Sequence, residues 1–357
     1  MKVDNIFHTK QYSTLGQAVM RLRWRGVVTE LIITATIFAS IALGIYPYGY
    51  DRLRRRIVSS KYCRIYCICV DVILICLALY AWPKEKLVNL ERIYYWTLVQ
   101  LLSQFIIAVN ISALFVIMWT NWSEYASVLG IIKEFATFER TYFARHKRLA
   151  TTCVTYANYM ILKSLAMVLR NISYIYVVLV LIPGMSFAVA VVHTIAMILV
   201  NVISLVVFHF YMFILATYRY IWIMKQRIKI IAASTGCRSS QLEINEITGV
   251  YIRILRLCQQ YGRIYGKLML LCICGVASLN VMTIIVLLFV WRSSENALNM
   301  MYCWYVLIIN TLDFWLTIAV CELALGTAAQ LVELQRYFNN REHMDAALAR
   351  EVSYCWE

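Results

Sequence analysis

The stretch RYIWIMKQRIKIIAASTGCRSSQLEINEITGVYIRILRLCQQYGRIYGK, residues 219–267, is the longest polar interval in an otherwise apolar sequence. It holds nine Lys or Arg residues and only two acids, Glu243 and Glu246. Apolar runs long enough to cross a bilayer lie on both sides of it, at 186–217 and 268–291. Because basic residues beside membrane spans are retained in the cytoplasm, residues 218–267 are predicted to form a cytoplasmic helical loop. The orientation of every other segment follows from this loop.

The composition of the 357-residue chain excludes a soluble protein. Hydrophobic residues make up 62% of it and charged residues 15%, whereas a soluble domain carries about a quarter charged residues. Several apolar runs reach the ~20 residues that a membrane helix needs, and they are continuous rather than alternating, which favours helices over a β-barrel. The predicted fold class is therefore all-α: a polytopic helical membrane protein that forms one transmembrane domain over residues 1–357.

Six full spans and one unusual N-terminal segment follow from the apolar runs. The spans are predicted at 65–82, 93–118, 164–182, 186–217, 268–291 and 301–325. With these boundaries 29 of the 34 Lys and Arg residues lie on one side of the membrane and four on the other, which predicts a cytoplasmic N-terminus.

Residues 27–50 are also apolar, but Gly44, Pro47 and Gly49 interrupt the end of the segment and basic residues flank both sides. We interpret this segment as a re-entrant or interfacial helix, and an ordinary first span is the alternative.

Other functional classes find little support in the residues. The net charge of +15 does not indicate nucleic-acid binding, because the basic residues lie in short segments beside spans. The twelve cysteines have neither the spacing of a disulfide framework nor that of a zinc site. The motifs of zinc proteases, serine hydrolases and P-loop proteins do not occur. We therefore expect no enzyme activity, no metal and no cofactor.

Ionisable side chains inside a span are costly in lipid, so each one suggests an interhelical contact or a ligand site. Asp71 and Arg170 both lie in the inner third of their spans, which would allow them to pair. Asp313 lies near the middle of the last span, one turn after Asn310, and Glu322 lies near the inner end of that span. For each of these groups a structural hydrogen bond or ion pair is the simpler explanation, and contact with a ligand is the alternative.

Aromatic residues crowd the predicted outer ends of the spans. Such residues form an interfacial belt, or they line a pocket that opens outward among the helix ends. The candidates for contact with a ligand are Tyr94, Tyr95, Tyr174, Tyr176, His193 and Tyr302.

An apolar stripe runs along the basic loop, where Ile247, Val250, Ile254 and Tyr261 recur at helical spacing. Outside the membrane such a stripe needs a partner, which is either the neighbouring segment 219–233 or another subunit. These four residues are the candidate subunit anchor.

Three motifs resemble a known family, the insect gustatory receptors of the insect chemoreceptor superfamily. They are GIYPY at 44–48 with Asp51 and a basic run after it, YRYIW at 218–222, and DFWLTIAVCELA at 313–324. The resemblance covers nearly the whole chain. It implies a ligand-gated, non-selective cation channel that detects tastants and mediates their acceptance or avoidance. It also implies a homo- or hetero-tetramer with other gustatory receptor subunits, in the plasma membrane of gustatory or other sensory neurons.

The resemblance further implies a tastant pocket in the outer halves of the helices and cytoplasmic helix ends that gather between subunits. Members of the family have one more span, which lines the pore. Residues 326–357 contain no further apolar run, so this last helix is expected to be missing from the chain.

Two other classes of protein stay open. A G-protein-coupled receptor would need an N-terminus outside the cell, and the chain lacks an Asp-Arg-Tyr motif at an inner span end and an Asn-Pro-x-x-Tyr motif. A small-molecule transporter would be expected to show an internal repeat of spans, and none is detectable.

Overall fold

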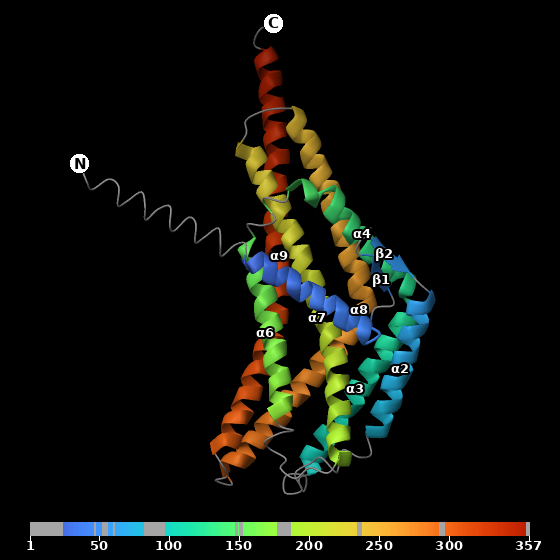
Figure 1. Ribbon diagram of the computed structural model, residues 1–357. Coiled ribbons are helices and arrows are strands. Elements are labelled where there is room, and N and C mark those ends of the chain that lie inside the picture. Colours follow the sequence, from blue (N-terminus) through green and yellow to red (C-terminus); the bar gives the residue numbers. More distant parts are fainter. Residues whose placement is uncertain are drawn as a thin grey trace, which may run out of the picture.

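The computed structural model describes residues 24–45, 48–51, 56–59, 61–81, 97–146, 149, 153–176, 187–233, 238–292 and 297–354. This part of the chain is a bundle of long helices with one short β-hairpin (Figure 1). An N-terminal helix, Trp24–Ala42, comes first. It is followed by β1 (Tyr48–Asp51), β2 (Arg56–Ser59), α2 (Lys61–Ala81), α3 (Thr97–Ser123), α4 (Tyr125–Thr141), η2 (Phe143–His146), α6 (Val154–Tyr176), α7 (Phe187–Ala233), α8 (Arg238–Arg292) and α9 (Ala297–Tyr354).

The helices confirm a polytopic helical membrane protein. In the described residues, six segments are long and apolar enough to cross a bilayer: Trp24–Ala42, Lys61–Tyr80, Leu101–Ser123, Ala190–Ile231, Glu243–Leu288 and Met300–Arg336. Helix α6 is a further long helix whose hydropathy is lowered by Lys163 and Arg170. It begins at Val154 instead of the predicted residue 164, so Lys163 lies within the bundle and not in the preceding loop.

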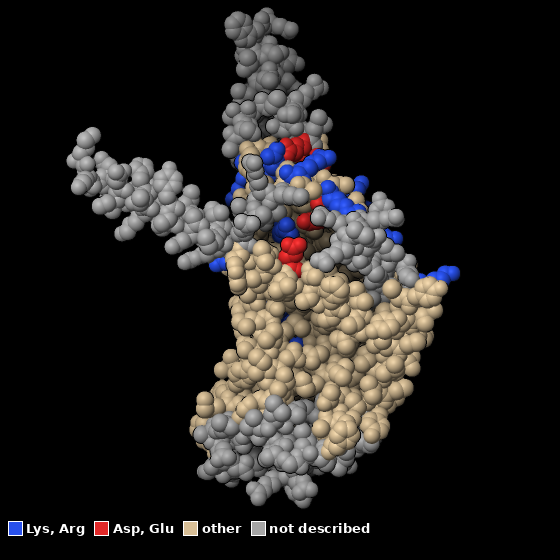
Figure 2. All heavy atoms as spheres, in the orientation of Figure 1, with Lys and Arg blue, Asp and Glu red and all other residues tan. Residues whose placement is uncertain are grey.

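The exterior of the bundle divides into a charged end and an apolar remainder. Figure 2 shows Lys, Arg, Asp and Glu gathered toward the end where α7 finishes and α8 begins, whereas the rest of the described surface is tan. We call the end that holds Arg227 and Glu243 the charged end, and the opposite end, where α8 finishes and α9 begins, the apolar end. Large apolar side chains such as Leu101, Leu288 and Ile308 are exposed on the apolar surface, as expected of a surface that faces lipid.

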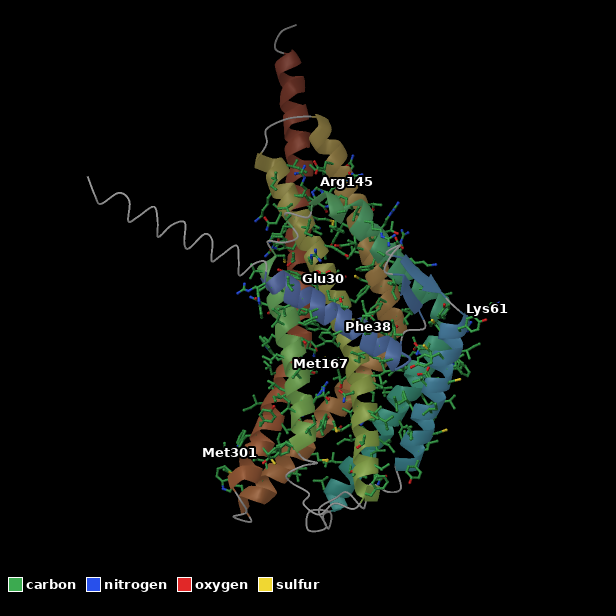
Figure 3. All side chains as sticks on the ribbon, in the orientation of Figure 1. Glu30, Phe38, Lys61, Arg145, Met167 and Met301 are labelled. Atoms are coloured by element: carbon green, nitrogen blue, oxygen red, sulfur yellow. The ribbon has the colours of Figure 1, made fainter. Side chains whose placement is uncertain are left out.

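The N-terminal helix crosses the bundle obliquely, in front of α6 and α7 (Figure 1). Its buried side carries small hydroxyl residues and its exposed side carries bulky apolar ones: Thr29, Thr36 and Ser40 are buried, whereas Val27, Leu31 and Phe38 are exposed. Figure 3 labels Glu30 and Phe38 on this helix. The Ser40 hydroxyl lies 2.9 Å from Nε2 of the buried His209 on α7. This contact joins the N-terminal helix to the centre of the bundle.

Gly44 ends the N-terminal helix. Its φ of 70° lies in the left-handed region, which glycine adopts without strain. The Gly44 amide donates to the Ile41 carbonyl at 3.2 Å, and the Ile45 amide donates to the Ser40 carbonyl at 2.8 Å, the two bonds of a Schellman motif. The predicted interruption at Gly44 is thus confirmed, and the chain turns into the antiparallel β1–β2 hairpin.

We expect Gly44→Ala to destabilise the protein by about 1–3 kcal/mol, because alanine is strained at this φ. Its Cβ would also lie 2.9 Å from Cβ of Val70 on α2. The matched control is Gly26→Ala on the same helix, where a Cβ would meet no atom within 4 Å. Thermal unfolding of the purified protein in detergent measures both variants. Equal melting temperatures for the two would contradict this account of Gly44.

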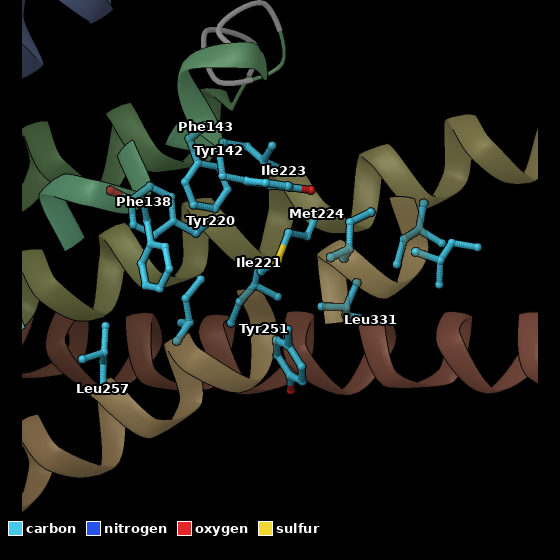
Figure 4. Packing of buried hydrophobic residues seen from close by; sticks show 14 of the residues in the cluster. Phe138, Tyr142, Phe143, Tyr220, Ile221, Ile223, Met224, Tyr251, Leu257 and Leu331 are labelled. Carbon is cyan, nitrogen blue, oxygen red and sulfur yellow. The ribbon is translucent and has the colours of Figure 1, made fainter. Parts of the chain in front are cut away.

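Among the described residues, three buried clusters fill the bundle. One lies at the charged end among α4, η2, α7, α8 and α9, the second joins α2, α3, α7 and α8, and the third joins α6, α7 and α9. Figure 4 shows the first cluster, in which the rings of Phe143 and Tyr220 stack with centroids 4.1 Å apart.

Ion pairs surround this cluster: Glu243 accepts from Arg227, and Glu246 lies 3.6 Å from Arg145. Both acids of the basic loop are therefore engaged within the chain.

The apolar stripe of the basic loop is covered within the chain. Ile247 and Ile254 are completely buried, Tyr261 is buried and Val250 is half-buried, all in the cluster at the charged end. Ile221, Met224 and Ile228 of α7 belong to the same cluster, so the predicted companion segment supplies part of the covering. Whether these four residues also anchor a second subunit stays a prediction. Other apolar residues of α8, such as Ile252 and Leu255, are exposed.

Candidate functional site

Lys163 and Arg170 on α6 and Asp313 on α9 form a charged cluster inside the apolar bundle. The Lys163 ammonium lies 2.7 Å from Oδ1 of Asp313, and the Arg170 guanidinium lies 3.6 Å from Oδ2 of the same carboxylate. The side chains are 2%, 14% and 13% exposed for Lys163, Arg170 and Asp313, respectively. Isolated charges are unstable in such surroundings, so the ion pairs determine which faces of α6 and α9 meet.

The Lys163 ammonium has a full set of acceptors. Besides the Asp313 carboxylate, it donates to the Asp313 backbone carbonyl and to the Thr317 hydroxyl, both at 2.9 Å. The Tyr211 ring centroid lies 5.3 Å from Nζ, within the range of a cation–π contact. Three donors and three acceptors match the capacity of an ammonium group. Lys163 is therefore satisfied entirely by the protein.

Hydrogen bonds continue the α6–α9 contact toward the apolar end, in antiparallel order. The Tyr305 hydroxyl donates to the Leu169 carbonyl at 2.9 Å, and the Tyr302 hydroxyl lies 3.4 Å from the Ser173 carbonyl. Beyond them the rings of Tyr176 and Tyr302 stack, with centroids 5.4 Å apart and planes 24° apart. The two helices thus present aromatic surface on the apolar-end side of the charged cluster.

The structure brings some of the predicted ligand contacts together. Tyr176 and Tyr302 stack on each other, and Tyr174 is half-buried on the same turn of α6. His193 lies on α7, but its side chain is outside the described residues, as are Tyr94 and Tyr95 entirely.

Two of the predicted intramembrane polar residues have different partners from those suggested by the sequence. Arg170 does not pair with Asp71: Asp71 lies on α2, and its carboxylate accepts from Nδ2 of Asn121 on α3 at 3.4 Å. The expected pair is therefore wrong, because α2 packs against α3 and α7 whereas α6 packs against α7 and α9. Glu322 is exposed on α9, in line with a carboxylate that reaches the bundle surface.

The predicted span boundaries place Lys163 in a loop, whereas the structure places it within α6. A signal was present, because Lys163 and Arg170 are seven residues apart and thus lie on one face of a helix. If the span predicted at 164–182 began one turn earlier, both cations would lie inside the bundle. Asp313 on the last span would then be a candidate partner for both.

A second group of buried polar residues surrounds a small cavity between the N-terminal segment, α3, α7 and α8. The cavity is lined by Ile45, Ile117, Thr120, Asn121, Val206, His209 and Tyr265. Through Asn121 it adjoins the buried carboxylate of Asp71. The polar groups in its wall come from α3, α7 and α8, so the cavity lies where these three helices pack together.

The chain is similar to chemosensory receptors over most of its length. Residues 35–354 match the 7tm Chemosensory receptor family. The Drosophila melanogaster protein named "Putative gustatory receptor 22a" is 25% identical over 332 residues, which cover 91% of this chain and 83% of that protein. The "Gustatory receptor for bitter taste 22e" of the same organism is 22% identical over 340 residues, which cover 93% of this chain and 85% of that protein. Since the family match spans nearly all of the bundle, this chain belongs to the 7tm chemosensory receptor family.

Proposed function

We propose that this chain is a subunit of a gustatory receptor that binds a small organic tastant and gates a non-selective cation current. The subunit works in the plasma membrane of a sensory neuron, as a homo- or hetero-tetramer with other gustatory receptor subunits. The charged end, with the N-terminus, lies in the cytoplasm, since basic residues are retained on that side. The N-terminal helix enters the membrane obliquely without crossing it.

The observation that carries the proposal is the polar and aromatic surface between α6 and α9. Charged groups deep in a membrane bundle are costly and mark ligand or ion sites. Here they lie next to stacked tyrosines, and most ligand pockets combine aromatic surface with a few polar groups. The relative named for bitter taste suggests small organic compounds as the tastants.

The channel proposal is tested by co-expressing the chain with a second gustatory receptor subunit in cultured cells and recording whole-cell currents. A panel of bitter plant compounds that includes both alkaloids and aromatic acids should evoke an inward current that reverses near 0 mV and that requires this chain. Responses that run through G proteins, or uptake of the compound without current, would instead favour the receptor or transporter alternatives.

We expect Tyr176→Ala to shift the tastant dose–response curve to higher concentration by about tenfold. Removing the ring breaks the stack with Tyr302 and takes away aromatic contact surface worth about 1 kcal/mol or more. The same recordings measure the shift. Trp291→Ala is the matched control, because Trp291 is an exposed aromatic residue near the apolar end of α8. A shift of equal size in both variants would contradict a pocket at Tyr176.

A further inference from the structure

We propose that Arg170 binds the anionic group of the ligand, a carboxylate, so that the receptor prefers organic acids over their neutral analogues. The inference rests on the proposed function and specifies the chemistry of the ligand. It starts from an imbalance of charge in the cluster on α6 and α9.

The cluster contains two cations and one carboxylate. Lys163 and Arg170 both face Asp313, and Glu322, the other acid of α9 up to residue 325, is exposed. The described parts of α3, α6, α7 up to residue 218 and α8 from 268 to 291 contain no acid. Asp71 on α2 is a further buried carboxylate of the described spans, and its partner is Asn121 on α3. The cluster on α6 and α9 therefore holds one positive charge more than its single carboxylate balances. A buried net charge is strongly unfavourable, and an anion is the group that would relieve it.

The uncompensated cation is Arg170. Lys163 holds the carboxylate at 2.7 Å and has two further acceptors, whereas Arg170 lies at 3.6 Å from Oδ2. A guanidinium has five N–H donors, and a carboxylate of the right geometry accepts two of them side by side. The contact of Arg170 with Oδ2 is longer than a hydrogen bond, so Asp313 does not hold the guanidinium in the side-by-side arrangement that another carboxylate could adopt.

Aromatic groups lie beside the cluster. The Arg170 side chain is 14% exposed, whereas that of Lys163 is 2% exposed, so Arg170 is the cation that a ligand can reach. On the apolar-end side, Tyr302 and Tyr305 bond to the α6 backbone within one turn of Arg170. A ligand with an aromatic ring and a carboxylate fits this combination of surfaces.

The test uses the purified chain in nanodiscs of neutral phosphatidylcholine, with benzoate and its neutral match benzamide as probes. Thermal unfolding and isothermal titration are both recorded. Benzoate should bind and raise the melting temperature, and benzamide should bind at least tenfold more weakly. Arg170→Gln should fold, since it leaves Lys163 paired with Asp313, and should weaken benzoate binding about tenfold to a hundredfold. Arg170→Lys should retain part of the binding.

Arg263→Gln is the control variant, because it removes an exposed basic residue of α8 and should bind benzoate like the wild type. Equal binding of benzoate and benzamide, or full benzoate binding by Arg170→Gln, would overturn the inference. The inference would also fail if phosphatidylglycerol stabilised the protein through Arg170 and prevented benzoate from binding. The anion at Arg170 would then be a lipid headgroup. Benzoate-evoked currents that Arg170→Gln leaves unchanged would also overturn it, while the proposed receptor function would stand.

Discussion

Asp313→Ala is expected to abolish stable folding of the receptor. The carboxylate of Asp313 is the partner of both Lys163 and Arg170, so its removal leaves two buried cations without their ion pairs. Breaking one buried pair costs about 3–5 kcal/mol, which is a large share of the ~5–15 kcal/mol that stabilises a typical protein. Size-exclusion profiles and thermal unfolding of the detergent-purified protein measure the loss.

The control is Glu322→Ala, which removes an exposed carboxylate nine residues further along the same helix and should leave stability unchanged. A triple variant, Lys163→Met with Arg170→Met and Asp313→Leu, should restore folding, because apolar residues of similar size can replace a buried ionic cluster. If Asp313→Ala were as stable as Glu322→Ala, the cluster would not hold α6 and α9 together.

Ile254→Asp is expected to disrupt the helical layer at the charged end. Ile254 is 0% exposed within the cluster formed by α4, η2, α7, α8 and α9. A carboxylate at this position would be buried without a partner, at a cost of several kcal/mol. Limited proteolysis at the loops of the charged end should show faster cleavage, and the melting temperature should fall.

Ile252→Asp provides the comparison for this prediction. Ile252 lies two residues away on the same helix but is 51% exposed, so an aspartate there should leave the fold of the single chain intact. If Ile252→Asp keeps its protease resistance but loses its oligomeric state, the exposed face of α8 contacts another subunit. If the two variants were equally sensitive to protease, burial of Ile254 within the chain would not explain the effect of Ile254→Asp.

The sequence was sufficient for the fold class and for most helix positions. Continuous apolar runs and the uneven distribution of Lys and Arg predict long membrane helices, and glycine at residue 44 predicts the end of the N-terminal helix. These features are local, because hydropathy and turn chemistry depend on residues close in the chain. The motif-based resemblance to gustatory receptors agrees with the family match over residues 35–354.

The pairing of polar residues could not be predicted in the same way. Asp71 and Arg170 have similar depths in their spans, but depth does not say which helices are neighbours. The partner of Arg170 is Asp313, 143 positions later in the chain, and the choice depends on how α6 and α9 pack. The apolar stripe of α8 is a similar case. Its periodicity predicts that Ile247 and Ile254 are buried, but it does not predict which segment buries them.

The uninterrupted length of α8 has a mechanical consequence. Its 55 residues, at about 1.5 Å of rise each, give about 80 Å of helical path that joins the charged end to the apolar end. Figure 1 shows that this path changes direction between the two ends, so α8 is a bent beam and not a straight rod. Because its two arms belong to one helix, turning the arm at the apolar end also turns the arm at the charged end, as in a crank.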